Sequence, residues 1–419
     1  MVHLRSTSGR DPNLSVIHLD AVRGFAALIV LVGHARVLFF SSVTGHLLIH
    51  PVLTNSLNRG KMVVSNLAAS TNSIGHEAVM VFFVLSGLLV GGSVLKLMKN
   101  NKWSWKGYLL KRMTRLWIVL IPALLLGAIL DHLGMHIFSN PHSIYRAPSE
   151  QTLVVGDLSS KYSPKIMLGN VAFLQNIRVP TAGSNVALWS LANEFWYYIA
   201  FPFLLLALTG KRTFWQRAVS FGVFTGIMVV IGRDASRLFL VWVLGALVSL
   251  LPLKLSKTIA KWGTVFFAVV LSVALVWVKK HIVNIATAEF TIGLLCACLL
   301  YFMLHHTQKA KDSFYSLVAA FTSRISYTLY LVHVPILIFL CACIDNPWHI
   351  WTRSLGNVAI VMSVCGFTIA LAFGFYLLFE ANTDRVRLVI AQKMDRVAHE
   401  VDHLVAPVVG TPPARSPSA

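Results

Sequence analysis

Long apolar segments recur along the chain and are separated by short polar segments. A helix needs about 20 mostly apolar residues to cross a bilayer, and ten segments approach that length. One further apolar segment, 166–177, is too short to cross, so we expect it to lie at the interface or to re-enter. The pattern therefore predicts an all-α, polytopic membrane protein with about ten transmembrane helices. The ten segments are 16–40, 77–95, 116–133, 187–208, 214–231, 236–253, 262–278, 286–304, 325–344 and 356–379.

The composition favours the same class. Of the 419 residues, 56% are hydrophobic and only 12% are charged, whereas about 25% of residues in soluble domains are charged. So few charges cannot cover a soluble multidomain enzyme, and so much apolar surface excludes a disordered chain. The five cysteines include two Cys-Ala-Cys pairs, at 296–298 and 341–343. Helical neighbours two apart point about 200° away from each other, so neither pair is expected to chelate a metal.

Lysine and arginine set the expected orientation. An even number of spans places both termini on one side, and segments on that side hold 23 Lys and Arg against 11 on the other. Because positively charged loops stay inside, both termini are predicted to be cytoplasmic. The net charge of +20 then reflects topology, and no nucleic-acid partner is expected. We expect a cytoplasmic segment over 1–15, a transmembrane domain over 16–380, and a cytoplasmic tail over 381–419, disordered from about Asp402.

Two ionisable residues in the first apolar segment, Arg23 and His34, share one helical face. Their separation of eleven residues corresponds to about 20° beyond three turns and to roughly 16 Å along the axis. Ionisable groups within a span mark function by default, so this face is predicted to line a cavity. The alternative is an arginine that snorkels toward the surface and a histidine bonded to a neighbouring backbone.

Arg112 and Arg115 lie one turn apart, just inside the predicted cytoplasmic surface and within a basic segment. Planar guanidinium groups bind phosphate through paired hydrogen bonds. The pair therefore suits a phosphate ligand, although topology signalling and lipid headgroup binding predict the same residues.

A polar stripe begins the fourth long apolar segment. Trp189 precedes Ser190 and Glu194, which lie four residues apart on one face. A carboxylate within a span must be paired or hydrated. An arginine, His34 or substrate hydroxyls would satisfy it, and the aromatic residue fits an interfacial belt or a sugar platform.

A second stripe lies in the ninth segment. Ser326 and His333 are seven residues apart, about two turns, and share a face. Pro335 lacks an N–H and so frees a carbonyl one turn back. A helix–helix hydrogen bond with a kink is the alternative role for this stripe.

In their order along the chain, these motifs resemble the acyltransferase-3 family of integral membrane acyltransferases, which acylate cell-envelope glycans and related small molecules. The resemblance runs from residue 19 to 380. Met80 departs from the pattern, since the family often has Asp there, and Glu77 lies one turn earlier. Asn382 stands where the family commonly has Pro. The five blocks are 19–24 followed by His34, which gives the Arg-x10-His spacing; Val-Phe-Phe-Val-Leu-Ser-Gly at 81–87; Arg112-x-x-Arg115; Trp-Ser-Leu-x-x-Glu from Trp189 with Tyr198 and Pro202; and Ser-Tyr-x-x-Tyr-Leu-x-His-x-Pro at 326–335.

The resemblance implies acyl transfer, with acetyl-CoA the expected donor and succinyl an open alternative. The acceptor would be a hydroxyl of a cell-envelope or exported polysaccharide or glycolipid, on the far side near the predicted loop 134–186. It also implies a multi-pass protein of the inner membrane, surrounded by lipid and without a metal. Arg112 and Arg115 would hold the phosphates of coenzyme A. His34 would act as general base or carry the acyl group briefly.

The remaining polar residues receive supporting roles on the same grounds. Arg23 would guide the pantetheine arm or stabilise charge on the thioester oxygen. Glu194 would orient His34 or bind hydroxyls. Substrate binding is assigned to Trp189, Ser190, Ser326 and His333.

Two other classes of protein stay open. A proton-coupled transporter of a small polar or sugar-like solute would use Arg23, His34 and Glu194, although transporters often show internal repeats and none is found here. A non-catalytic subunit of a polysaccharide machine would keep the fold but would need no Arg23–His34 pair. Replacing His34 separates the three, because only a catalyst loses acyl transfer while it stays folded.

Overall fold

The computed structural model describes residues 16–40, 74–146, 153, 157–209, 212–252, 255–280, 284–305 and 313–405. Within these ranges the chain is helical, and its only β-type pairing is an isolated bridge between Gln175 and Val179. The predicted all-α class is confirmed. The helices are α1 Val16–Phe40, α3 Ile74–Ser86, a π-helical segment Gly87–Gly91, α4 Gly92–Lys99, α5 Trp105–Ile137, α6 Pro164–Val171, α7 Trp189–Leu208, α8 Phe214–Val248, α9 Lys257–Lys280, α10 Ile285–Leu304, α11 Phe314–Ile344, α12 Leu355–Leu378 and α13 Thr383–Val405.

Eight helical stretches of the described chain are long and apolar enough to cross a membrane, which confirms a polytopic membrane protein. They correspond to eight of the ten predicted segments. The other two, 214–231 and 236–253, fall within the single helix α8, which bends at Gly232. The backbone there has φ 85° and ψ 175°, a conformation that glycine adopts readily. The number ten and the cytoplasmic position of both termini stay predictions.

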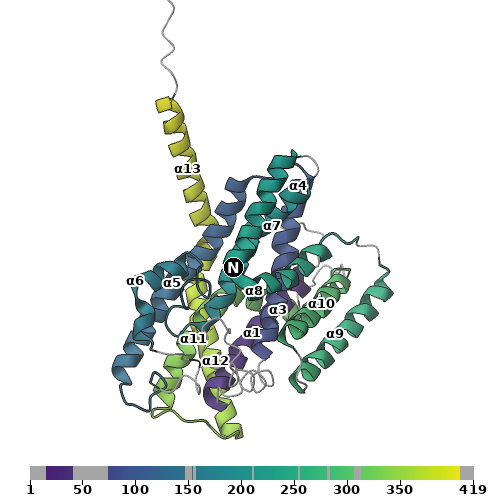
Figure 1. Cartoon of the computed structure of the whole chain (residues 1–419). Helices are drawn as coiled ribbons and strands as arrows, with labels where there is room; N and C mark the ends of the chain where they lie inside the picture. The colour runs from purple at the N-terminus through teal and green to yellow at the C-terminus, as the bar shows by residue number, and fades with distance from the viewer. Residues whose placement is uncertain are drawn as a thin grey trace, which may run out of the picture.

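The helix α11 lies at the centre of the bundle. It packs against α1, α5 and α12, while α8 packs against α3, α7 and α10. The helix α9 packs mainly on α10, and Figure 1 shows this pair at one edge of the molecule. This pair joins the rest of the bundle mainly through the contacts of α10 with α8 and α3.

Large apolar side chains cover much of the outside of the bundle. Exposed examples are Trp215 and Val229 on α8, Phe266 and Val273 on α9, and Phe367 on α12. In water, contiguous patches of this kind drive association. In a bilayer they match the hydrocarbon, so the surface pattern agrees with the membrane assignment.

Two prolines within helices leave carbonyl groups that side chains from other elements satisfy. Pro335 lacks the N–H that would bond Leu331 one turn back, and the Asn185 side chain donates to that carbonyl instead, at 2.7 Å. This is the freed carbonyl that the sequence predicted. Pro202 similarly leaves the carbonyl of Tyr198, which accepts from the Tyr108 hydroxyl at 2.9 Å. Both substitutes come from distant parts of the chain, so each proline creates a polar tie between elements.

The helices α3 and α8 approach each other at backbone distance. A Cβ added at Gly87 would lie 1.8 Å from the carbonyl oxygen of Trp242, and one at Gly245 would lie 1.9 Å from that of Val84. Small residues allow this close packing of membrane helices. The π-helical segment begins at Gly87, directly after Ser86, and such segments are frequent at functional sites.

The connection between α5 and α7 is held by one buried carboxylate. Asp131, fully buried on α5, accepts hydrogen bonds from the Tyr162 hydroxyl at 2.5 Å and from the backbone and side chain of Ser184 at 2.8 Å each. This connection contains α6, whose eight residues are too few to cross a bilayer, in line with the prediction for 166–177. The hydropathy pattern also predicts a loop over 41–76; residues 41–73 lie outside the described part, and 74–76 belong to α3.

The predicted cytoplasmic tail contains a helix that the hydropathy pattern did not predict. Residues Thr383–Val405 form α13, which projects from the bundle in Figure 1. Lys106 at the start of α5 pairs with Asp395 at 2.8 Å, so α13 contacts the N-terminal turn of α5. The helix includes Asp402, where disorder was expected to begin, and residues 406–419 lie outside the described part.

Candidate active site

Two histidines from distant segments meet inside the bundle. His34 Nδ1 on α1 lies 2.8 Å from His333 Nε2 on α11, and their rings stack with centroids 5.0 Å apart. His333 is buried. The pair forms because α1 and α11 pack along each other, and Gly24 brings them close: a Cβ there would lie 2.0 Å from Thr322 Oγ1.

The surroundings of His333 determine which nitrogen carries each proton. Its Nδ1 lies 3.0 Å from the carbonyl oxygen of Leu329 and 2.9 Å from that of Tyr330. Carbonyl oxygens only accept, so Nδ1 is the donor and Nε2 of a neutral His333 is the acceptor. His34 must then donate from Nδ1, and a neutral His34 holds its lone pair on Nε2. The arrangement makes His34 Nε2 the basic nitrogen of the pair.

Ser190 and Tyr330 extend this pair toward α7. The two hydroxyls lie 2.7 Å apart, and the Tyr330 ring lies 5.9 Å from the His333 ring between centroids. Ser190 is buried. Ser190 is therefore linked to the histidine pair through Tyr330.

Glu194 is the acceptor of a second polar cluster, one turn further along α7. Its carboxylate accepts from Ser86 Oγ at 2.6 Å and from the Tyr198 hydroxyl. Ser86 in turn accepts from the Trp242 indole N–H at 3.1 Å. A carboxylate among apolar helices requires such donors; here Ser86 of α3 and Tyr198 of α7 supply them, and Trp242 of α8 supports Ser86.

One face of α7 connects the two clusters. Ser190, Glu194 and Tyr198 recur every four residues, so they lie on one face about 6 Å apart along the axis. Ser190 contacts the histidine cluster and Tyr198 contacts Arg112. The face forms a polar column about 12 Å long through the interior of the bundle.

Arg112 stands at the far end of this column. Its guanidinium carbon lies 5.7 Å from the centroids of both the Tyr108 and Tyr198 rings, which are favourable cation–π positions. Only 9% of Arg112 is exposed, and its Nε has no hydrogen-bond partner. Within the described part of the chain it forms no ion pair with a carboxylate. A buried cation of this kind favours an anionic ligand.

Arg115, one turn further along α5, faces Glu380. The Glu380 carboxylate accepts from Thr328 N and Oγ1, at 3.2 and 2.5 Å. Arg115 and Arg23 both interact electrostatically with Glu380, and Arg115 also with Glu194. Arg115 is exposed while Arg112 is buried, so the two guanidiniums have different surroundings on neighbouring turns.

A comparison with protein families finds that the acyltransferase-3 model, described as an acyltransferase domain, matches residues 16–377. This match covers most of the chain and includes every helix of the column. The chain belongs to the acyltransferase-3 family. No curated protein and no solved structure matches it significantly.

Membership of the acyltransferase-3 family makes this chain a membrane acyltransferase. Among the described residues, no group of His, Cys, Asp or Glu is arranged to hold a metal ion. The described cysteines are free thiols, and Cys341 is buried while Cys343 is exposed, as expected for neighbours two apart on a helix.

The structure gives the contacts of three residues to which the sequence assigned roles. Glu194 was expected to orient His34 or bind hydroxyls, and among the described residues its hydrogen-bond donors are Ser86 and Tyr198. His333 was assigned to substrate, but its ring nitrogens contact His34 and the backbone. Ser326 donates to the carbonyl of Ser323 at 2.7 Å, a bond within its own helix. The roles of these residues in catalysis stay predictions.

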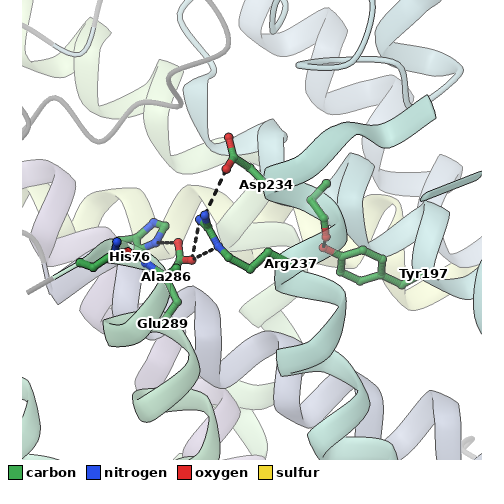
Figure 2. A network of polar contacts seen from close by, with 8 residues as sticks. His76, Tyr197, Asp234, Arg237, Ala286 and Glu289 are labelled. Atoms are coloured by element: carbon green, nitrogen blue, oxygen red, sulfur yellow. Dashed lines mark hydrogen bonds and ion pairs between the residues drawn. The ribbon is translucent and has the colours of Figure 1, made fainter. Parts of the chain in front are cut away.

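Sequence reasoning missed a second charged cluster, shown in Figure 2. Glu289 on α10 lies between His76 at the start of α3 and Arg237 on α8, and Arg237 also contacts Asp234. The signal was present, since Glu289 is a carboxylate within the apolar segment 286–304. Its partners lie in distant segments, and hydropathy does not show which segments meet.

Proposed function

We propose that this protein transfers an acyl group, acetyl in the first instance, from cytoplasmic acyl-CoA to a hydroxyl of a polysaccharide or glycolipid at the inner membrane. The observation that carries the proposal is the polar column, with a basic histidine pair at one end and the buried cation Arg112 at the other. Acyl transfer from a thioester carrying phosphates needs both ends.

His34 is the proposed general base. Its Nε2 takes the proton of the acceptor hydroxyl while the oxygen attacks the thioester carbonyl carbon. The C–S bond then breaks, and the thiolate recovers the proton from the imidazolium, so the products are the ester and the free thiol. His333 accepts the hydrogen bond from His34 Nδ1 and is the proposed positioning residue. A transient acyl group on the same nitrogen is the alternative route.

Arg112 and Arg115 are the proposed binding residues for the donor phosphates. Guanidinium groups suit phosphate oxygens, and the exposure of Arg115 beside the buried Arg112 gives one contact at the surface and one within. Arg23, which interacts electrostatically with Glu380, is the proposed residue that guides the pantetheine arm or stabilises charge on the thioester oxygen. Glu194 holds the column together through Ser86 and Tyr198.

The first test compares membranes that contain the wild type, His34→Ala and His136→Ala at equal levels. His136 is an exposed histidine of α5 and serves as the matched control. With acetyl-CoA labelled in the acetyl group, we expect His34→Ala to lose label transfer by about 10²–10⁴-fold and His136→Ala to keep it.

Free thiol release and label in the glycan or lipid fraction are the two measurements. Equal transfer in the wild type and His34→Ala membranes would remove His34 from the chemistry. Failure of the wild type to bind acetyl-CoA would overturn the donor assignment and favour a transporter.

A further inference from the structure

The charged cluster of Figure 2 and the ring stacked on it bring together the ends of three helices and the bend of α8. His76 begins α3, Glu289 lies near the start of α10, and Arg237 follows the bend of α8. Trp189, the first residue of α7, stacks on His76. Arg112 contacts Tyr198, nine residues further along α7 from Trp189. The cluster therefore stands at the end of the bundle opposite Arg112, which is the side predicted to face the acceptor.

Glu289 is held on two sides. Its Oε1 lies 2.9 Å from His76 Nε2, and its Oε2 accepts from Arg237 Nε and Nη2 at 3.2 and 2.9 Å. Arg237 Nη1 lies 3.2 Å from Asp234. Glu289 is only 5% exposed, whereas Arg237 is 34% exposed. These contacts leave the carboxylate and the His76 ring with few alternative orientations.

The fixed His76 ring sets the position of Trp189. The two rings are nearly parallel, at 17°, with centroids 5.7 Å apart. Phe83 meets Trp189 edge-on at 6.2 Å. Because His76 Nε2 is bonded to Glu289, the imidazole cannot turn without losing that bond. The orientation of the indole is thus fixed by its contacts with the His76 ring and with Phe83.

Trp189 is linked to the histidine pair through Ser190 and Tyr330. The next residue, Ser190, lies 2.7 Å from the Tyr330 hydroxyl, and Tyr330 packs against His333. A shift of Trp189 would therefore move the start of α7 and with it Ser190, whose hydroxyl contacts Tyr330 beside His333. The cluster and the proposed base belong to one continuous set of contacts.

We propose that His76 is a positioning residue for the acceptor. Held by Glu289 and Arg237, it keeps the Trp189 indole as the wall against which a hydroxyl-bearing glycan lies, so that one hydroxyl reaches His34. The C–H face of a sugar ring packs on an aromatic plane, which is why orientation of the indole matters. This inference rests on the proposed acyltransferase function.

A purely structural role predicts a different result. If the cluster only joined α3, α8 and α10, its loss would reduce the amount of folded protein without changing how each folded molecule divides its acyl groups. The discriminating measurement is the ratio of label transferred to the membrane glycan and lipid fraction to label released as free acetate. That ratio does not depend on the amount of folded protein.

The experiment uses labelled acetyl-CoA with full-length protein in membranes. His76→Gln keeps a donor for Glu289 but loses the stacked ring, and His76→Phe keeps a ring but loses the bond. Arg233→Gln is the control, because Arg233 lies on α8 beside the cluster and pairs with no described carboxylate. We expect the ratio to fall about tenfold or more in His76→Gln, less in His76→Phe, and not at all in Arg233→Gln.

An unchanged ratio in both His76 variants overturns the positioning role and leaves the cluster structural. An equal fall in Arg233→Gln overturns it as well, because the effect would then follow charge at this surface. A separate outcome is that wild-type membranes transfer no more label than His34→Ala membranes. That result removes the proposed function and this inference together.

Discussion

At the residue scale, the burial of Arg112 carries a large desolvation cost. A guanidinium that is buried between two tyrosine rings without a described carboxylate is costly to desolvate. Its planar fork suits phosphate in a way that a lysine ammonium does not. Its contribution should therefore be visible in donor binding more than in folding.

The prediction concerns Arg112→Met and Arg112→Lys. A hydrogen bond to a charged group contributes about 1.5–3 kcal/mol, so Arg112→Met should raise the KM for acetyl-CoA about 10–100-fold, and Arg112→Lys by less. Thermal unfolding in detergent should show Arg112→Met at least as stable as the wild type, since a buried charge is replaced by an apolar side chain of similar length. A large loss of stability with an unchanged KM would contradict the donor role.

At the scale of elements, α7 and α11 depend on polar ties that replace missing helical hydrogen bonds. Asn185 serves the carbonyl of Leu331 because Pro335 cannot. Removal of Asn185 leaves a buried acceptor without a partner, which costs about 1–3 kcal/mol. Replacing Pro335 by alanine restores the N–H and removes the need for Asn185.

Asn185→Ala should therefore destabilise the protein by about 1–3 kcal/mol, whereas the same change combined with Pro335→Ala should cost clearly less than the sum of the two. A double-mutant cycle of thermal unfolding midpoints in detergent measures the coupling. Strict additivity would show that Asn185 does not act through this carbonyl.

The spacing of residues in the sequence predicted which polar groups share a helix face. The shared face of Arg23 and His34, the stripe on α7 and the freed carbonyl behind Pro335 all follow from helical periodicity along a single segment. Periodicity does not say which face meets which, so the contact between His34 and His333, 299 positions apart, could not be predicted. The same limit applies to Glu194 with Ser86. The helix α13 was missed because a search for apolar spans does not register a helix with so many charged residues.

At the scale of the whole molecule, orientation determines which end of the column meets the donor. The excess of Lys and Arg predicts cytoplasmic termini, and then Arg112 lies toward the cytoplasm and the His76 cluster toward the other side. A phosphatase that is active only outside the cytoplasm, fused after Ala419, should be inactive, and a fluorescent protein at the same site should be bright. The reverse pair of results would invert the proposed directions of donor and acceptor entry.

The four-residue recurrence of Ser190, Glu194 and Tyr198 also bears on how the chain can change in length. A single inserted residue between Ser190 and Tyr198 would rotate everything after it by about 100°, and Tyr198 would no longer face Arg112 while Ser190 still touched Tyr330. In this part of the enzyme the spacing between residues therefore matters as well as their identities. We expect this stretch of α7 to accept many substitutions at its other positions but no insertion or deletion.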